Sequence, residues 1–367
     1  MPTSDFDQPL VPEPILTTPQ TPPPGTHVFF GPLGLRAGWG ILIFLVLTAV
    51  LSLAFVVVAI RASGHAQEFR HRAAQQAQEA RAAKAAHTHP PIHPEHLSFV
   101  FLTETPQTAA VLLAALVLSY LERRRFAVYG LGLRHLRDAL PGAAVGLAAL
   151  SLLVGLLRAF HLVAFDTRLL HGSAIARYGL GWLLFFLIVG IFEEFVFRGY
   201  VLFTLMRGLL GLARRIAPAH ERLAAFWMSA VVWSLVIFAA HTGNAGENPA
   251  GLAAVFVAGI LFSYALWRTG SLWWGIGFHA TWDWAQSFLY GVPDSGTLSQ
   301  GRLFLTHPLG RAWLSGGVDG PEGSILILPV LLLVFLVLRL HRISAQPPVE
   351  PESLPAFMHV PQPEAIP

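Results

Sequence analysis

The chain has 367 residues, of which 54% are hydrophobic and only 12% are charged, with a formal net charge of +3. Soluble domains carry roughly twice that charged fraction, so the composition predicts a polytopic membrane protein. The chain contains no cysteine, which excludes disulfides, thiolate metal sites and cysteine catalysis. The basic residues cluster beside apolar runs, where they set membrane topology, and they do not suggest binding to nucleic acid.

Both ends of the chain are rich in proline. Residues 1–36 contain the run Pro22-Pro23-Pro24. Residues 343–367 contain QPPVEP near their start and VPQPEAIP at their end. This composition favours extended, unfolded tails. No cleavable signal peptide is expected, because a polar stretch precedes the first apolar segment, which should stay as an anchor.

Eight apolar segments are long enough, or nearly so, to cross a ~30 Å hydrocarbon layer at 1.5 Å per residue. The sequence therefore predicts an all-α polytopic membrane protein of about eight transmembrane helices. The segments are residues 37–60, 106–121, 139–157, 179–203, 223–241, 250–267, 271–290 and 324–340.

Arginine clusters predict the orientation of the chain. They follow the second, fourth and eighth segments, which puts all three on one side if every segment crosses the membrane. Basic residues favour the cytoplasmic side, so both termini are predicted to be cytoplasmic. The Ala, Arg, Pro and Gly bias indicates a bacterial chain, and hence the inner membrane.

The polar loop of residues 61–99 lies on the opposite side in this topology, although it also carries basic residues. Residues 66–86 read as a polar surface helix. A histidine-rich stretch can bind metal, but the prolines of HTHPPIHPEH favour an extended chain without helical ligand spacing. We therefore expect a solvated loop. Its histidines are His65, His71, His87, His89, His93 and His96.

The fourth apolar segment carries three formal charges in the run EEFVFRG, at Glu193, Glu194 and Arg198. Ionisable groups within a membrane span are costly, so they usually face a protein interior or a water-filled cavity. Glu194 and Arg198 are four residues apart on one helical face and can form an ion pair. Glu193 lies about 100° round the helix axis and is the carboxylate left for chemistry.

Polar groups interrupt two further apolar segments. His241 ends the fifth segment, and the seventh contains His279 and Asp283 within GFHATWDW. His279 and Asp283 are four residues apart, so they share a helical face and can bind one object or each other. We expect one site among the fourth, fifth and seventh helices.

The chemistry available to these residues is activation of water. Glu193 can take the proton while His241 holds the water, and His279 with Asp283 can stabilise the oxyanion formed at an attacked carbonyl. No phosphate-cradling loop, nucleotide fingerprint or serine nucleophile elbow is present, so nucleotides are not expected as partners. Alternatively, Glu193, His241 and His279 could hold a divalent metal such as zinc; a glutamate mechanism requires no cofactor.

Three stretches together resemble a known family. EEFVFRGY, the histidine in IFAAHTGN, and GSLWWGIGFHATWDWAQSFLYGVPDSG are similar to the three motifs of the CAAX-protease and bacteriocin-processing (CPBP) family. That family includes the type II CAAX prenyl endopeptidases and is similar to lysostaphin-resistance-protein-like membrane proteins. The resemblance covers about residues 100–290.

The resemblance implies an all-helical intramembrane endopeptidase that cleaves a membrane-associated, CAAX-type protein or peptide. It implies that Glu193 is the water-activating base, with Glu194 and Arg198 in support. It assigns His241 to the water, and His279 with Asp283 to the oxyanion. One alternative is a non-catalytic protein of the same fold, acting as an immunity or regulatory factor. Another is a transporter or channel, because buried Glu, Arg and His also suit proton relays, although the helices show no inverted repeat.

Two positions depart from the family pattern. Ile237 stands where the family usually has Phe, and Asp283 where it often has Asn. An ionised Asp283 would repel an oxyanion, so it must be protonated, pair with His279 or contribute to a metal site.

The predicted topology also separates the two histidines. His241 would lie about 28 Å from the inner surface, whereas His279 is in the inner half. We therefore expect the fifth segment to start inside the membrane or to tilt, so that both imidazoles converge within about 12 Å.

Overall fold

The structure is a computed structural model that describes residues 28–31, 34–86, 91–243 and 247–340. The predicted tails lie outside these residues except at 28–31 and 34–36. There the chain forms the antiparallel strands β1 (Phe30–Gly31) and β2 (Gly34–Leu35), so ordered structure begins before the first membrane helix. His87 and His89 also lie outside the described part.

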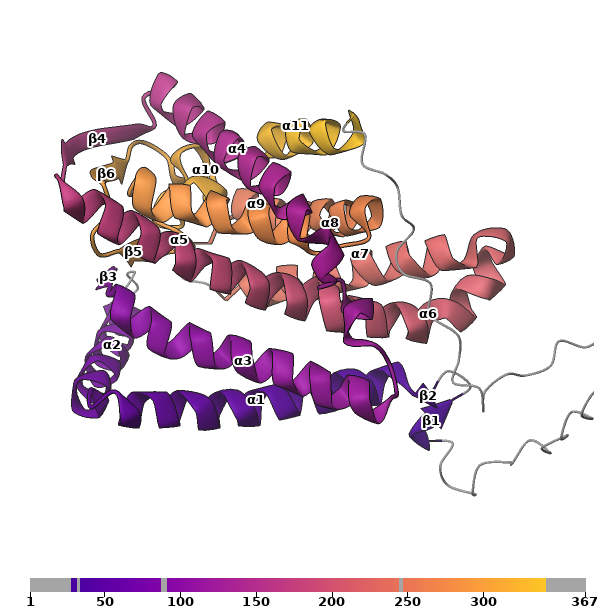
Figure 1. Cartoon of the computed structure of the whole chain (residues 1–367). Coiled ribbons are helices and arrows are strands. Elements are labelled where there is room, and N and C mark those ends of the chain that lie inside the picture. The colour runs from indigo at the N-terminus through magenta and orange to yellow at the C-terminus, as the bar shows by residue number, and fades with distance from the viewer. Residues whose placement is uncertain (1–27, 32–33, 87–90, 244–246, 341–367) are drawn as a thin grey trace, which may run out of the picture.

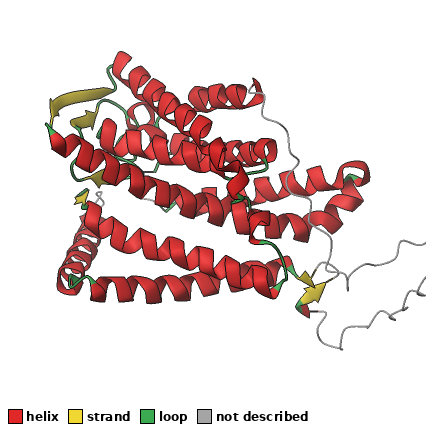
Figure 2. Cartoon of the chain, in the orientation of Figure 1, coloured by secondary structure: helices red, strands yellow, loops and turns green. Residues whose placement is uncertain are grey.

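Helices make up most of the described chain (Figures 1 and 2). Short 3-10 and π turns join or extend several of them. The long helices are α1 (Ala37–Ala62), α2 (Ala66–Ala86), α3 (Leu97–Leu121), α4 (Ala139–Ala159), α5 (Ser173–Glu194), α6 (Leu202–Ile216), α7 (Glu221–His241), α8 (Pro249–Thr269), α9 (Trp273–Trp284) and α11 (Ile327–Leu340).

Within the described residues, 6 helices are long and apolar enough to cross a membrane. They correspond to the first six predicted segments, which supports the all-α polytopic fold. The last two segments form shorter helices: α9 has 12 residues before a π turn, η6 (Ala285–Leu289), and α11 has 14. The number of spans expected was about eight, and the structure supports six by length.

Two of the predicted boundaries were wrong. α3 begins at Leu97, so the polar loop ends there and not at residue 99, and the helix continues through Pro106. The fourth segment is longer than expected, because α5 continues through the π turn η4 (Phe195–Val201) into α6. The polar helix expected over residues 66–86 is confirmed as α2.

The long loop between α9 and α11 contains two strands that the sequence did not predict, β5 (Leu298–Ser299) and β6 (Phe304–Pro308). Each pairs with a strand from an earlier connection: β6 runs antiparallel to β4 (Val163–Arg168), and β5 runs parallel to β3 (Pro94–Glu95). These pairs lie at one end of the bundle (Figure 1). The same loop contains the short helix α10 (Ala312–Ser315) and the turn η7 (Pro321–Gly323). Ser295, Asp319 and Glu322 of this loop line a cavity that is also lined by residues of α5, α7, α8 and α9.

α9 is the central helix and packs against α4, α5 and α8. Its contact with α4 is close because glycines face backbone: a Cβ at Gly142 would collide with the carbonyl of Trp274, and one at Gly146 with that of Phe278. This is the small-residue spacing that lets membrane helices approach at backbone distance. Thr281 Oγ1 donates to the carbonyl of Ala143 at 2.7 Å, which fixes the register of α9 on α4.

Candidate active site

The glutamate pair occupies the end of α5, directly before the π turn η4. The side chain of Glu194 is only 2% exposed, and its Oε1 lies 2.8 Å from an Nη of Arg198. The guanidinium also stacks over the ring of Phe262, 4.9 Å from its centroid. The ion pair expected from the four-residue spacing is therefore present, and it compensates the buried charge of Glu194.

Glu193 is the accessible member of the pair. Its side chain is 37% exposed, and its Oε2 lies 3.6 Å from Nε2 of His279. It lines a cavity of about 160 Å³ between α5, α7, α8 and α9. This carboxylate therefore has both an open face and an imidazole neighbour.

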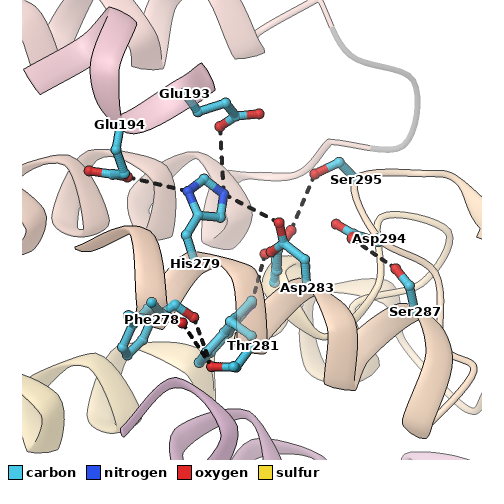
Figure 3. A network of polar contacts seen from close by, with 12 residues as sticks. Glu193, Glu194, Phe278, His279, Thr281, Asp283, Ser287, Asp294 and Ser295 are labelled. Atoms are coloured by element: carbon cyan, nitrogen blue, oxygen red, sulfur yellow. Dashed lines mark hydrogen bonds and ion pairs between the residues drawn. The ribbon is translucent and has the colours of Figure 1, made fainter. Parts of the chain in front are cut away.

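His279 lies at the centre of the polar network (Figure 3). Its Nδ1 is 3.3 Å from Oε1 of Glu194, and its Nε2 is 3.4 Å from Oδ2 of Asp283 as well as 3.6 Å from Glu193. Glu193 and Glu194 both contact His279, so both lie on the side of α5 that faces α9. Both ring nitrogens thus face carboxylate oxygens, an environment suited to an imidazole that donates at either nitrogen.

His241 approaches the same cavity from the end of α7. Its Nδ1 lies 2.8 Å from the carbonyl of Ile237, one turn earlier. A carbonyl oxygen only accepts, so this bond places the proton on Nδ1 and leaves the lone pair of Nε2 available. Both imidazoles therefore line one cavity. The helix that carries His241 begins at Glu221, two residues before the predicted fifth segment.

Three acidic residues near this site were not singled out from the sequence: Asp294, Asp319 and Glu322. Oxygens of Asp294 and Glu322 lie within 4.8 Å of each other and of an oxygen of Asp283. Nε1 of Trp282 donates to Glu322 at 3.0 Å, and Oγ of Ser287 donates to Asp294 at 2.9 Å. The third, Asp319, also lines the cavity. Burial raises the pKa of Asp294 well above its usual value, and it raises the pKa of Glu322 and brings that of Asp319 to about 7.

A weak signal for these residues was present in the sequence. Asp294 lies in the GVPDSG end of the third motif, whereas Asp319 and Glu322 follow with no spacing that relates them to it. Within the described residues, the three carboxylates of Asp283, Asp294 and Glu322 are the group whose ligand atoms come closest to a metal-binding arrangement. The set expected to hold a metal, Glu193, His241 and His279, does not form such a group among the described residues.

Residues 173–285 match the family described as type II CAAX prenyl endopeptidase Rce1-like. The resemblance inferred from the three motifs is confirmed. The Rce1-like segment runs from the first residue of α5 to Ala285, and it contains all six residues that the sequence singled out. It does not include Asp294, Asp319 or Glu322. No curated protein and no solved structure matches the chain.

Proposed function

We propose that this chain is an intramembrane endopeptidase that hydrolyses a peptide bond with a water activated by Glu193. The observation that supports it most directly is the shared cavity: an accessible carboxylate from α5 and imidazoles from α7 and α9 line one space. The Rce1-like match supports protease activity on a membrane-associated protein or peptide, of which a prenylated CAAX-type chain is one kind.

Glu193 is the general base in this mechanism. It takes a proton from the water, and the free Nε2 of His241 accepts the second hydrogen bond and orients the attack. The acid form of Glu193 then returns the proton to the leaving amine. Glu194 and Arg198 support this step, because their 2.8 Å ion pair holds the end of α5 in place.

The contacts from Nε2 of His279 to Asp283 and Glu193, at 3.4 Å and 3.6 Å, are long, so its Nε2–H is the donor to the oxyanion that develops on the attacked carbonyl. An ionised Asp283 cannot do this itself, because it has no hydrogen to donate. At 3.4 Å from Nε2 it instead fixes the orientation of the imidazole, and so acts as a positioning residue. This role explains how aspartate can stand where the family often has asparagine.

The test is cleavage of a tagged peptide library, prenylated and unprenylated, by the purified protein in lipid. Glu193→Gln and His241→Ala are expected to abolish cleavage while leaving the protein folded. Glu79→Gln is the matched control, since that carboxylate lies on α2 and pairs with His93. Full cleavage by Glu193→Gln would reject the mechanism, and would favour the non-catalytic regulatory alternative if the biological effect also persisted.

A chelator and elemental analysis decide the cofactor. The proposed mechanism uses the carboxylate and imidazoles alone, so cleavage is expected to survive chelation with no bound zinc. Loss of cleavage on chelation, restored by one metal, would replace this mechanism with metal-generated hydroxide. Fusion reporters at both ends test the proposed inner-membrane orientation with cytoplasmic termini.

A further inference from the structure

One end of the active-site cavity is strongly acidic. Among the described lining residues the sole arginine is Arg198, which is already paired with Glu194. The apolar remainder of the wall comes mainly from α8, α9 and α11. The lining carboxylates are Glu193, Glu247, Asp283, Asp319 and Glu322.

Asp319 is the residue without a structural explanation. It is only 5% exposed, yet among the described residues no hydrogen bond or ion pair holds its carboxylate. It does not cap the neighbouring helix, because Oδ1 of Asn248 already accepts from the amides of Ala250 and Gly251 at the start of α8. A buried carboxylate without a partner is costly, which points to a ligand that compensates it.

Two glycines make room for the carboxylates. A Cβ at Gly251 would collide with Oε1 of Glu247 and lie 2.9 Å from Oδ2 of Asp319. A Cβ at Gly323 would lie 2.8 Å from the same oxygen of Asp319. The carboxylates of Glu247 and Asp319 therefore converge on the first turn of α8. We call Glu247, Asp319 and Glu322 the acidic subsite.

We propose that the acidic subsite binds the side chain of a lysine or arginine in the peptide substrate, next to the scissile bond. This inference rests on the proposed function and names the substrate class. A cationic side chain that enters the cavity pairs with the carboxylates and offsets their desolvation. Ala254, Val255 and Leu331 line the same cavity and take the apolar neighbours of the basic residue.

The geometry favours a long organic cation over a metal ion at this subsite. Of the three subsite residues, only Glu322 belongs to the group of Asp283, Asp294 and Glu322; within the described residues, Glu247 and Asp319 belong to no group of three ligands whose atoms lie within 4.8 Å of one another. A divalent ion needs its oxygen ligands about 2.0–2.6 Å from its centre, and so needs them close together. An ammonium or guanidinium group with several donors can instead bridge carboxylates that are spread along a wall.

Peptide binding to the Glu193→Gln protein in lipid nanodiscs tests this inference without cleavage. The probes are fluorescent apolar peptides with one lysine or, at the same position, uncharged norleucine. The lysine peptide is expected to bind about tenfold more tightly, and Asp319→Asn or Glu247→Gln to reduce that preference to about twofold or less. Asp166→Asn is the control, because that exposed carboxylate on β4 pairs with His307.

Protonation gives a second readout. Burial, with Glu322 and Glu247 nearby, raises the pKa of Asp319 to about 7, so the lysine preference is expected to be larger at pH 8 than at pH 6.

Equal binding of the two peptides would overturn the inference. So would a preference that survives both subsite variants but disappears in Asp166→Asn, since that result reports surface charge. A preference abolished by calcium or magnesium and restored by chelator would assign the subsite to a metal ion. Cleavage is measured separately with the unmodified protein, so selective lysine binding without any cleavage would reject the proposed function alone.

Discussion

Gly146 allows the close approach of α4 to α9, and adding a single methyl group there should separate them. Its Cβ would collide with the carbonyl of Phe278 and lie 2.7 Å from Oγ1 of Thr281. Phe278 directly precedes His279, so the backbone that must move is the backbone that carries the imidazole. Gly155 lies on the same helix with nothing within 4 Å of its Cβ position, which makes it the matched control.

The two substitutions should have opposite effects. Gly155→Ala gains helix propensity, up to about 1 kcal/mol. Gly146→Ala gains the same propensity but overpacks a backbone contact, which typically costs about 1–3 kcal/mol. Since a carbonyl cannot rotate away as a side chain can, the cost should be near the top of that range. We therefore expect a net gap of about 2–3 kcal/mol between the variants.

Thermal unfolding of the detergent-solubilised variants measures this gap, together with cleavage activity below the unfolding temperature. Gly146→Ala should unfold at a lower temperature than Gly155→Ala and should also lose activity while still folded, because His279 is displaced. If the two variants were equally stable and active, the backbone-level contact between α4 and α9 would be refuted.

Three further predictions concern charged residues. Arg198→Met should destabilise the protein by about 3–5 kcal/mol in thermal unfolding, because it leaves Glu194 buried without its partner; a cost equal to that of an exposed arginine would contradict the pairing. Asp283→Asn should retain cleavage, since the amide oxygen can still accept from His279, and complete inactivation would show that the charge is required. For Asp319, burial raises the folded pKa from 3.8 to about 7, so its contribution to stability is present below about pH 4 and is lost as the pH rises through 7. Asp319→Asn should therefore be more stable than the parent at pH 8, by at most about 4 kcal/mol. If the free energy of unfolding of the variant and of the parent changed with pH in the same way, the raised pKa of Asp319 would be contradicted.

Local spacing predicted the parts of the site that depend on a single helix. The four-residue spacing of Glu194 with Arg198, and of His279 with Asp283, appears in the structure as contacts of 2.8 Å and 3.4 Å. Helical periodicity determines such pairs regardless of what the rest of the chain does.

Long-range placement could not be predicted in the same way. Glu322 reaches the cavity, and Asp294 reaches Glu322 and Asp283, through the loop that β6 ties to β4. A pairing between residues 143 positions apart, such as Ala164 with His307, has no signal in a local window. The start of α3 was missed for a different reason. Glu104, Pro106 and Gln107 lower its hydropathy, although the helix continues through them.

An experimental map that resolves water tests the central claim most directly. We expect one ordered water in the cavity within hydrogen-bond distance of both Glu193 and Nε2 of His241, in the resting protein. A metal ion at that position, or a cavity filled by lipid with Glu193 turned away from both imidazoles, would contradict the account.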